Sequence, residues 1–190
     1  MYTDFKTLMA DVAACTKCPL CETRTHTVFG EGSPRARIML IGEGPGRDED
    51  VLGRPFVGKA GQLLDKMLAS IDLTRNDVYI ANILKCRPPR NRDPQPSEAA
   101  ACIGYLRAQA ALIRPPILVC LGRIAAQYIL GQEVRITRDR GVWRNVKGFD
   151  IMPTYHPAAL LRNEDWKRES YKDLLAIRAR YDQLLKEEHE

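Results

Sequence analysis

Short apolar runs of strand length recur along the chain and are separated by segments with helical spacing of apolar residues. The apolar runs cover residues 37–42, 78–82, 117–121 and 149–152, each bounded by glycine, proline or polar residues. Helices are predicted over residues 5–14, 61–71, 97–113, 122–130 and 165–186. Strands that alternate with helices are joined by right-handed crossovers. The pattern predicts an α/β fold, a three-layer sandwich with a short, mainly parallel, four-stranded central sheet flanked by helices.

Length and composition are those of a single domain. The chain has 190 residues, of which 45% are hydrophobic, and it contains no internal repeat or long linker. We therefore expect one domain over residues 1–190, including the N-terminal and C-terminal helices. No apolar run reaches the roughly 20 residues that span a bilayer, and no secretion signal opens the chain. We expect a cytoplasmic protein without membrane contact and, since nothing indicates an obligate oligomer, a monomer.

The chain is mildly basic, which does not by itself indicate a binding partner. The chain carries 29 Lys+Arg and 24 Asp+Glu, a formal net charge of +5 at pH 7. This charge is compatible with a polyanionic partner, but an ordinary protein surface explains it equally well unless the basic residues cluster.

The cysteines have the pattern of a metal site. In reducing cytosol, the pair Cys15 and Cys18 is typical of metal binding or redox activity rather than of a disulfide. Cys86 and Cys102 stand alone in the sequence, whereas zinc sites usually gather two close pairs, so an iron-sulfur cluster is favoured over zinc. Cys21 continues the spacing of the first pair and could replace Cys86 or Cys102 as a ligand. A further cysteine, at position 120, lies inside an apolar run and is expected to be a small buried residue.

Three segments follow predicted strands and should meet at one sheet edge, where parallel α/β sheets bind their ligands. The first, Gly42–Asp50, is rich in glycine but lacks the lysine of a P-loop, and its acidic residues would repel phosphates. Its carboxylates could serve acid-base chemistry or could form only a solvated turn. The other two segments are 82–92 and 154–157.

Three side chains near this edge are candidates for binding a nucleobase. Phe56 lies in a Gly/Pro-framed loop, where an aromatic ring is either a core anchor or a stacking surface for a base. Asn82 ends the second strand, and its amide offers both a hydrogen-bond acceptor and donors, although it could simply be a turn residue. His156 follows the fourth strand beside a proline.

Four separated motifs together resemble the iron-sulfur, family 4 uracil-DNA glycosylases. The motifs are Gly42-Glu-Gly-Pro-Gly with Glu49-Asp50, the segment 53–65 (GRPFVGKAGQLLD), the segment 82–89 (NILKCRPP) and the segment 156–162 (HPAALLR). The resemblance covers about residues 15–162. It implies a uracil-DNA glycosylase-like fold and a monofunctional repair enzyme that hydrolyses the N-glycosidic bond of deoxyuridine in single- or double-stranded DNA, leaving an abasic site.

The resemblance also implies roles for individual residues. Cys15, Cys18, Cys86 and Cys102 would ligate a structural [4Fe–4S] cluster, leaving Cys21 free. Uracil would be bound by Gly44, Phe56, Asn82 and His156, with His156 stabilising the negative charge that develops on uracil O2. The catalytic set would be His156 with Glu43, on the water or sugar side, and Glu49, which would exclude the thymine methyl group. The best-known uracil glycosylases carry an aspartate where this loop has Gly44, so the resemblance leaves the general base unassigned.

DNA contacts are expected around this site, and we expect the protein to associate with the nucleoid of a prokaryote. The residues expected to contact DNA are Lys59, Arg87, Arg90, Asn91, Arg92, Leu160, Leu161 and Arg162. The segment 160–162 resembles an intercalating loop whose apolar residues fill the vacated base stack, but it could equally be the first turn of a helix packed on the sheet.

Other functions remain as alternatives. A branch of the superfamily that traps uracil-DNA covalently uses a histidine on an extra loop, and residues 87–97 contain no histidine, so turnover is expected. A non-catalytic iron-sulfur module that binds nucleic acid is the main alternative, and a redox carrier is the next.

Overall fold

A computed structural model of the chain describes residues 2–187, and within this range the sheet has six strands in the order β1-β3-β2-β4-β6-β5. The four predicted strands are its parallel centre: β2 (Ile38–Gly42), β3 (Val78–Asn82), β4 (Ile117–Leu121) and β6 (Phe149–Thr154). The expected four-stranded sheet is extended by two short antiparallel edge strands, β1 (Glu31–Gly32) and β5 (Arg144–Val146). These edge strands have too few residues to show an apolar alternation, which is why the sequence pattern did not reveal them.

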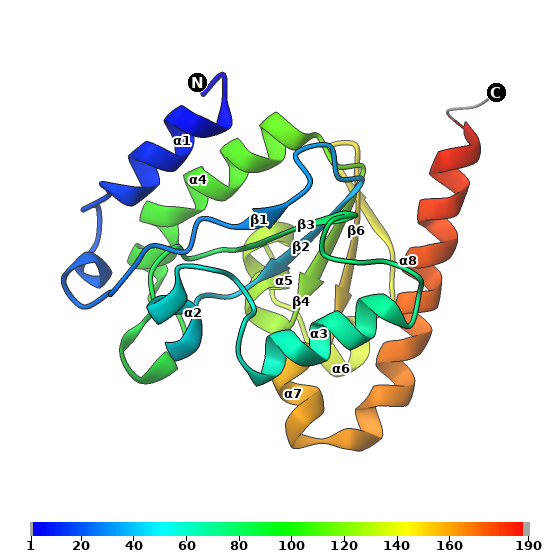
Figure 1. Cartoon of the computed structure of the whole chain (residues 1–190). Helices are drawn as coiled ribbons and strands as arrows, with labels where there is room; N and C mark the ends of the chain where they lie inside the picture. Colours follow the sequence, from blue (N-terminus) through cyan, green and yellow to red (C-terminus); the bar gives the residue numbers. More distant parts are fainter. Residues whose placement is uncertain (1, 188–190) are drawn as a thin grey trace.

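Both faces of the sheet are covered, as a three-layer sandwich requires (Figure 1). Alternate strand residues point to opposite faces. Ile38 and Leu40 pack with α3 (Lys59–Ala69) and α8 (Lys167–Glu187), whereas Met39 and Ile41 pack with α4 (Pro96–Ile113) and α5 (Arg123–Leu130). Because β2, β3 and β4 are buried along their whole length, their sequences are almost continuously apolar rather than alternating.

The N-terminal segment forms a third, smaller core against α4. Helix α1 (Phe5–Ala13) begins at Asp4, whose carboxylate accepts a hydrogen bond from the Thr7 N–H at 2.8 Å. Leu8 and Val12 of α1 pack with Leu84 and with cysteines from two other segments. The short 3-10 helix η1 (Pro19–Glu22) follows. This core therefore joins the first twenty residues to the loop after β3.

Two helices occupy segments for which the sequence left other structures open. The acidic stretch after β2 forms α2 (Arg47–Leu52) rather than a solvated turn, and Asp50 is buried, accepting two hydrogen bonds from the Thr25 N–H at 2.9 and 3.1 Å. The segment after β6 forms α7 (Pro157–Arg162), which was the alternative to an intercalating loop.

The remaining elements are short connections. They are the 3-10 helices η2 (Pro89–Asn91) and η3 (Glu164–Trp166) and the helix α6 (Ile136–Asp139). No helix among the described residues is long and apolar enough to cross a membrane.

Candidate active site

A cavity of about 780 Å³ lies at the carboxyl ends of the four parallel strands. Phe56, Asn82 and His156 all line it, although they come from segments far apart in the chain. Glu43, Gly44 and Glu49 line the same cavity, as do Lys59, Asn91, Arg92 and Arg162. The structure thus brings together ten of the fourteen residues expected to act on uracil or to contact DNA.

Asn82 presents an unusual amide. The residue is 2% exposed, and its Oδ1 is buried without a hydrogen-bond partner among the described residues. An orphaned buried acceptor is costly unless a ligand donates to it. Gly42 makes room for this amide, because a Cβ atom at position 42 would lie 2.3 Å from Asn82 Oδ1. The same Cβ would lie 2.7 Å from the Phe56 ring, so Gly42 is required by two cavity residues at once.

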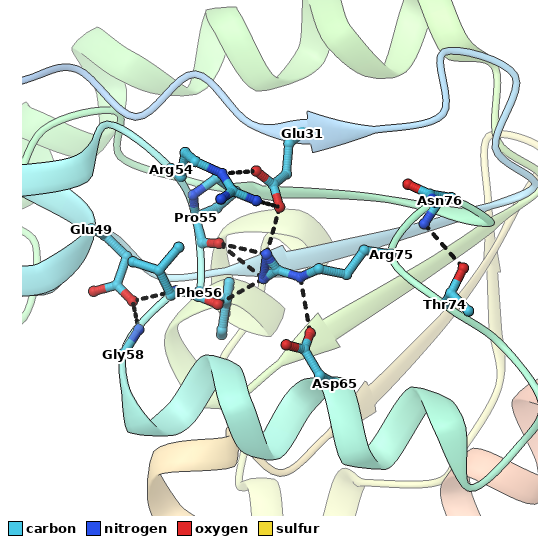
Figure 2. Close-up of polar contacts among 11 residues, drawn as sticks. Glu31, Glu49, Arg54, Pro55, Phe56, Gly58, Asp65, Thr74, Arg75 and Asn76 are labelled. Atoms are coloured by element: carbon cyan, nitrogen blue, oxygen red, sulfur yellow. Dashed lines mark hydrogen bonds and ion pairs between the residues drawn. The ribbon is translucent and has the colours of Figure 1, made fainter.

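Phe56 lies against His156, with ring centroids 5.5 Å apart and planes tilted by 32°. Its backbone has φ of 52°, a left-handed conformation that is uncommon for a residue with a side chain. Glu49 Oε1 accepts hydrogen bonds from the N–H groups of Val57 and Gly58, at 2.8 and 2.9 Å (Figure 2). Glu49 therefore holds the Phe56 loop at the start of α3.

The protonation state of His156 follows from its surroundings. Burial, aided by the Arg162 charge, lowers the pKa of His156 to about 4, although Glu49 acts in the opposite direction. The imidazole is therefore neutral at physiological pH. Its Nδ1 accepts a hydrogen bond from the Ala158 N–H at 3.1 Å at the start of α7. Because Nδ1 is an acceptor, the proton of the neutral ring is on Nε2, which makes Nε2 a donor.

Glu43 is the carboxylate with the most perturbed pKa in the cavity. Burial raises the pKa of Glu43 to about 7, with a further increase from the negative charge of Asp93 and a decrease from Arg123. A carboxylate with this pKa can exchange a proton near neutral pH. Asp93 and Arg123 themselves form an ion pair at 2.9 Å on the cavity wall.

The side chains expected to contact DNA differ in their solvent exposure and in the hydrogen bonds that they already make. Leu160 is 1% exposed and belongs to the core, because α7 turns it inward, so it is not available here to enter the base stack. Leu161, on the same helix, is 44% exposed and remains available. Arg92 pairs with Glu98 through two hydrogen bonds of 2.8 and 2.6 Å. Arg87 and Arg90 lie outside the cavity lining, and Arg87 Nε donates to Asn91 Oδ1 at 2.8 Å.

The four expected cluster ligands line a second, smaller cavity between α1, α4 and the loop after β3. Cys21 lines it too, so position alone does not separate it from Cys15, Cys18, Cys86 and Cys102. No three cysteine, histidine or carboxylate side chains in the described part of the chain are grouped closely enough to hold one metal ion. Thiols from three chain segments that line one common space are a donor set of the kind that holds a multi-iron cluster.

Hydrogen-bond donors already face two of these sulfur atoms. Arg24 Nη1 donates to Cys86 Sγ, and the Lys85 N–H donates to Cys102 Sγ, both at 3.2 Å. Donors of this kind stabilise thiolate ligands. Burial raises the pKa of the Cys102 thiol to about 11, so a bound cation is needed to keep it ionised at neutral pH. These residues fit an iron-sulfur cluster. Cys120 is fully buried in the sheet, as the sequence indicated.

A buried lysine connects the two cavities. Lys85 is 1% exposed, and its Nζ donates to the Asn82 carbonyl oxygen at 3.1 Å and to Gln109 Oε1 at 2.7 Å. Gln109 in turn donates to the Phe29 carbonyl oxygen and to Tyr79. Burial lowers the pKa of Lys85 to about 8.

Sequence reasoning missed several cavity residues. Arg47 and Arg123 add positive charge to the wall, and Tyr155 and Trp166 stack there with ring centroids 4.7 Å apart. Arg123 lies two residues after a predicted strand, which is a signal that could have identified it. Trp166 carries no such signal, because only the tertiary fold brings η3 to the sheet edge.

A buried amide, an aromatic ring and a neutral imidazole at the edge of a parallel sheet are groups that can bind a planar, hydrogen-bonding ring. A family model described as the uracil DNA glycosylase superfamily matches residues 29–177. The chain is 47% identical over 178 residues to a type-4 uracil-DNA glycosylase of Archaeoglobus fulgidus, covering 90% of this chain and 89% of the relative. It is 49% identical over 156 residues to the type-4 uracil-DNA glycosylase of Thermotoga maritima, covering 80% of each chain. It is also 30% identical over 190 residues to a type-5 uracil-DNA glycosylase of Pyrobaculum aerophilum, covering 84% of this chain and 83% of the relative. The chain therefore belongs to the uracil-DNA glycosylase superfamily, in its type-4 branch.

Proposed function

We propose that this protein is a DNA-repair enzyme that hydrolyses the N-glycosidic bond of deoxyuridine and releases free uracil. The observation that carries this proposal is the shared cavity in which Asn82 Oδ1 is buried without a partner beside Phe56 and His156. Family membership supports it. The base must leave the duplex to enter such a cavity, which costs a few kcal/mol that pocket contacts and phosphate contacts offset.

Asn82 would select uracil over cytosine. Uracil presents an N3–H donor, which suits the orphaned Oδ1, and an O4 acceptor, which suits the amide Nδ2. Cytosine presents the opposite pair. Each unmet buried group costs about 1–3 kcal/mol, so two mismatches give roughly two to four orders of magnitude of discrimination. Phe56 would stack on the flat face of the base. Gly44, which lines the cavity without a side chain, leaves room for it.

His156 would act on the leaving group. As the glycosidic bond stretches, negative charge develops on uracil O2 and positive charge on the sugar. A neutral imidazole whose Nδ1 is already occupied by the Ala158 N–H offers Nε2–H to that oxygen without a prior proton transfer. Preorganised donors of this kind are often the largest contribution to catalysis.

Glu43 would act on the water or sugar side. Its pKa of about 7 suits either stabilisation of the sugar cation or acceptance of a proton from water. Glu49 would stand where the thymine methyl group would otherwise enter, since its carboxylate lines the cavity and Oε1 is fixed by two N–H groups.

DNA, single- or double-stranded, would be held by cations around the cavity. Lys59 and Arg162 line its wall, and the exposed Leu161 would fill the space left in the base stack. Arg87, Arg90, Asn91 and Arg92 would meet the phosphate backbone from the loop before α4. We further propose that the protein acts as a monomer, as a single domain, in the cytoplasm and at the nucleoid of a prokaryote.

Cys15, Cys18, Cys86 and Cys102 would hold a [4Fe–4S] cluster. When bound, the cluster would supply structural cross-linking of three chain segments rather than chemistry at the base. The loop between Cys86 and Cys102, which carries the arginines, would thereby be fixed against the N-terminal segment.

The test is a uracil-release assay on cluster-loaded protein. Oligonucleotides with a single uracil, or with thymine or cytosine at the same position, are incubated with the protein and cleaved at abasic sites by alkali. We expect cleavage of the uracil strand alone, and its loss in Asn82→Ala with the visible absorbance of the cluster unchanged. Intact uracil oligonucleotides after treatment with loaded wild-type protein would refute the proposal.

A further inference from the structure

The loop that carries Phe56 is held from two sides by charged side chains. On one side, Glu49 Oε1 accepts the N–H groups of Val57 and Gly58. On the other, Arg75 Nη2 donates to the carbonyl oxygens of Pro55 and Phe56, at 3.0 and 2.7 Å (Figure 2). Backbone donors and acceptors of four consecutive residues are thus bound by one carboxylate and one guanidinium.

Arg75 is itself fixed by two carboxylates. Its Nε donates to Asp65 Oδ1 at 2.9 Å, and its Nη1 forms an ion pair with Glu31. Figure 2 shows the guanidinium between these two acids, with its remaining edge directed at the Phe56 loop. Arg75 lies in the turn between α3 and β3, and Glu31 belongs to the edge strand β1. The guanidinium therefore fixes the position of the loop relative to the sheet edge and to helix α3.

The loop needs this support because its conformation is unfavourable in isolation. Phe56 has positive φ, which places its Cβ close to backbone atoms. Gly61 shows how tightly the loop packs: a Cβ atom there would lie 1.7 Å from the Phe56 carbonyl oxygen. Strained backbone persists only where its surroundings over-determine it. The hydrogen bonds from Arg75 to the two carbonyl oxygens act directly on the backbone of the strained residue, Phe56.

We propose that Arg75, acting with Glu49, is a positioning residue for catalysis: it holds Phe56 in the left-handed conformation that sets its ring against the uracil pocket. The inference rests on the proposed function, because it assigns Phe56 the stacking face for uracil. Lysine cannot replace this arginine. A single ammonium group lacks the planar fork that binds two carbonyl oxygens and two carboxylates together.

The chain provides a matched control. Arg54 Nε donates to the same Glu31 at 2.8 Å, and the hydrogen bonds of its side chain go to Glu31 rather than to the carbonyl oxygens of Pro55 or Phe56. Its side chain is 62% exposed, compared with 20% for Arg75. Arg54→Lys and Arg75→Lys are the same chemical change in the same ion-pair network, and only Arg75 donates hydrogen bonds to the carbonyl oxygens of Pro55 and Phe56.

The experiment measures single-turnover uracil release at saturating enzyme, affinity for uracil-free duplex DNA and thermal unfolding. It uses cluster-loaded wild type, Arg75→Lys, Arg54→Lys, Phe56→Ala and the double variant Arg75→Lys/Phe56→Ala. We expect Arg75→Lys to slow release at least about tenfold, since displacement of a positioned group by a fraction of an ångström to 1 Å reduces rates by such factors. Arg54→Lys should stay within about twofold of wild type. Affinity for uracil-free DNA should not change.

The double variant distinguishes positioning from general destabilisation. If Arg75 acts through the Phe56 ring, Arg75→Lys should have less than about a twofold effect once the ring is absent. Equal activity of Arg75→Lys and Arg54→Lys would overturn the inference, as would a full, multiplicative loss in the Phe56→Ala background. An inactive wild type would instead refute the proposed function, so the two failures are distinguishable.

Discussion

Gly42→Ala tests the geometry of the pocket most directly. The substitution adds one methyl group at the carboxyl end of β2, where its carbon would lie 2.3 Å from Asn82 Oδ1 and 2.7 and 2.9 Å from two Phe56 ring atoms. Ordinary van der Waals contact begins at 3.4 Å, so the amide must retreat by about 1 Å. Both neighbours are buried, with Asn82 2% and Phe56 6% exposed.

A displacement of about 1 Å at a positioned group costs on the order of 100-fold in rate, or about 2.7 kcal/mol of transition-state stabilisation. Overpacking a buried site costs about 1–3 kcal/mol of stability. We therefore expect Gly42→Ala to fold with its cluster, unfold at a lower temperature and release uracil about 100-fold more slowly. The measurements are kcat/KM on uracil oligonucleotides, thermal unfolding and visible absorbance.

Gly104→Ala is the matched control. Position 104 lies in α4, and a Cβ atom there meets nothing within 4 Å. Alanine should leave activity unchanged and raise helix stability by roughly 0.5–1 kcal/mol. The reasoning is refuted if Gly42→Ala retains activity within threefold of wild type, because the amide and the ring would then not need the space that the structure gives them.

Three further predictions follow from the titrating and sulfur groups. If uracil release needs ionised Glu43, the single-turnover rate should rise about tenfold per pH unit up to about pH 7 and then level off. The same rise of the rate with pH in Glu43→Gln would contradict this. The pKa of His156, about 4 in the folded protein, lies below its ordinary value of 6.5, so the unfolded chain binds more protons between these values. Stability should fall by up to about 3 kcal/mol as the pH drops through that window, and chemical denaturation should show this loss in wild type but not in His156→Gln. Cys86→Ala should bleach the visible absorbance and lower the folding yield, whereas Cys21→Ala should do neither; bleaching by Cys21→Ala would reassign the ligand set.

The centre of the fold was predictable because burial on both faces makes β2, β3 and β4 almost continuously apolar. The runs at 78–82 and 117–121 coincide with β3 and β4 to the residue. The edge strands were not predictable, since two or three residues carry no period. Helix α2 was also missed, because its acidic sequence resembles a turn until Asp50 is seen to be buried against the Thr25 N–H.

The site was predictable to the extent that its residues end strands or follow them. Asn82 and His156 satisfy this rule, and topology alone brings them to one sheet edge. Arg75 does not: it lies in a turn on the approach to β3, and its function depends on carboxylates that are distant in sequence. A sequence motif could not separate Leu160 from Leu161. These neighbouring leucines on α7 are buried and exposed, respectively, and only the orientation of the helix determines which is which.

Lys85 has a consequence for how the protein would respond to iron shortage. Its backbone N–H contacts a cysteine sulfur, while its ammonium group supports the carbonyl of Asn82. A single residue thus joins the proposed cluster site to the residue proposed to bind uracil. If a cluster forms at the proposed ligands, its loss would remove one constraint on Lys85 and, through Lys85, on the backbone of Asn82. Under that proposal, iron depletion would lower uracil release as well as stability.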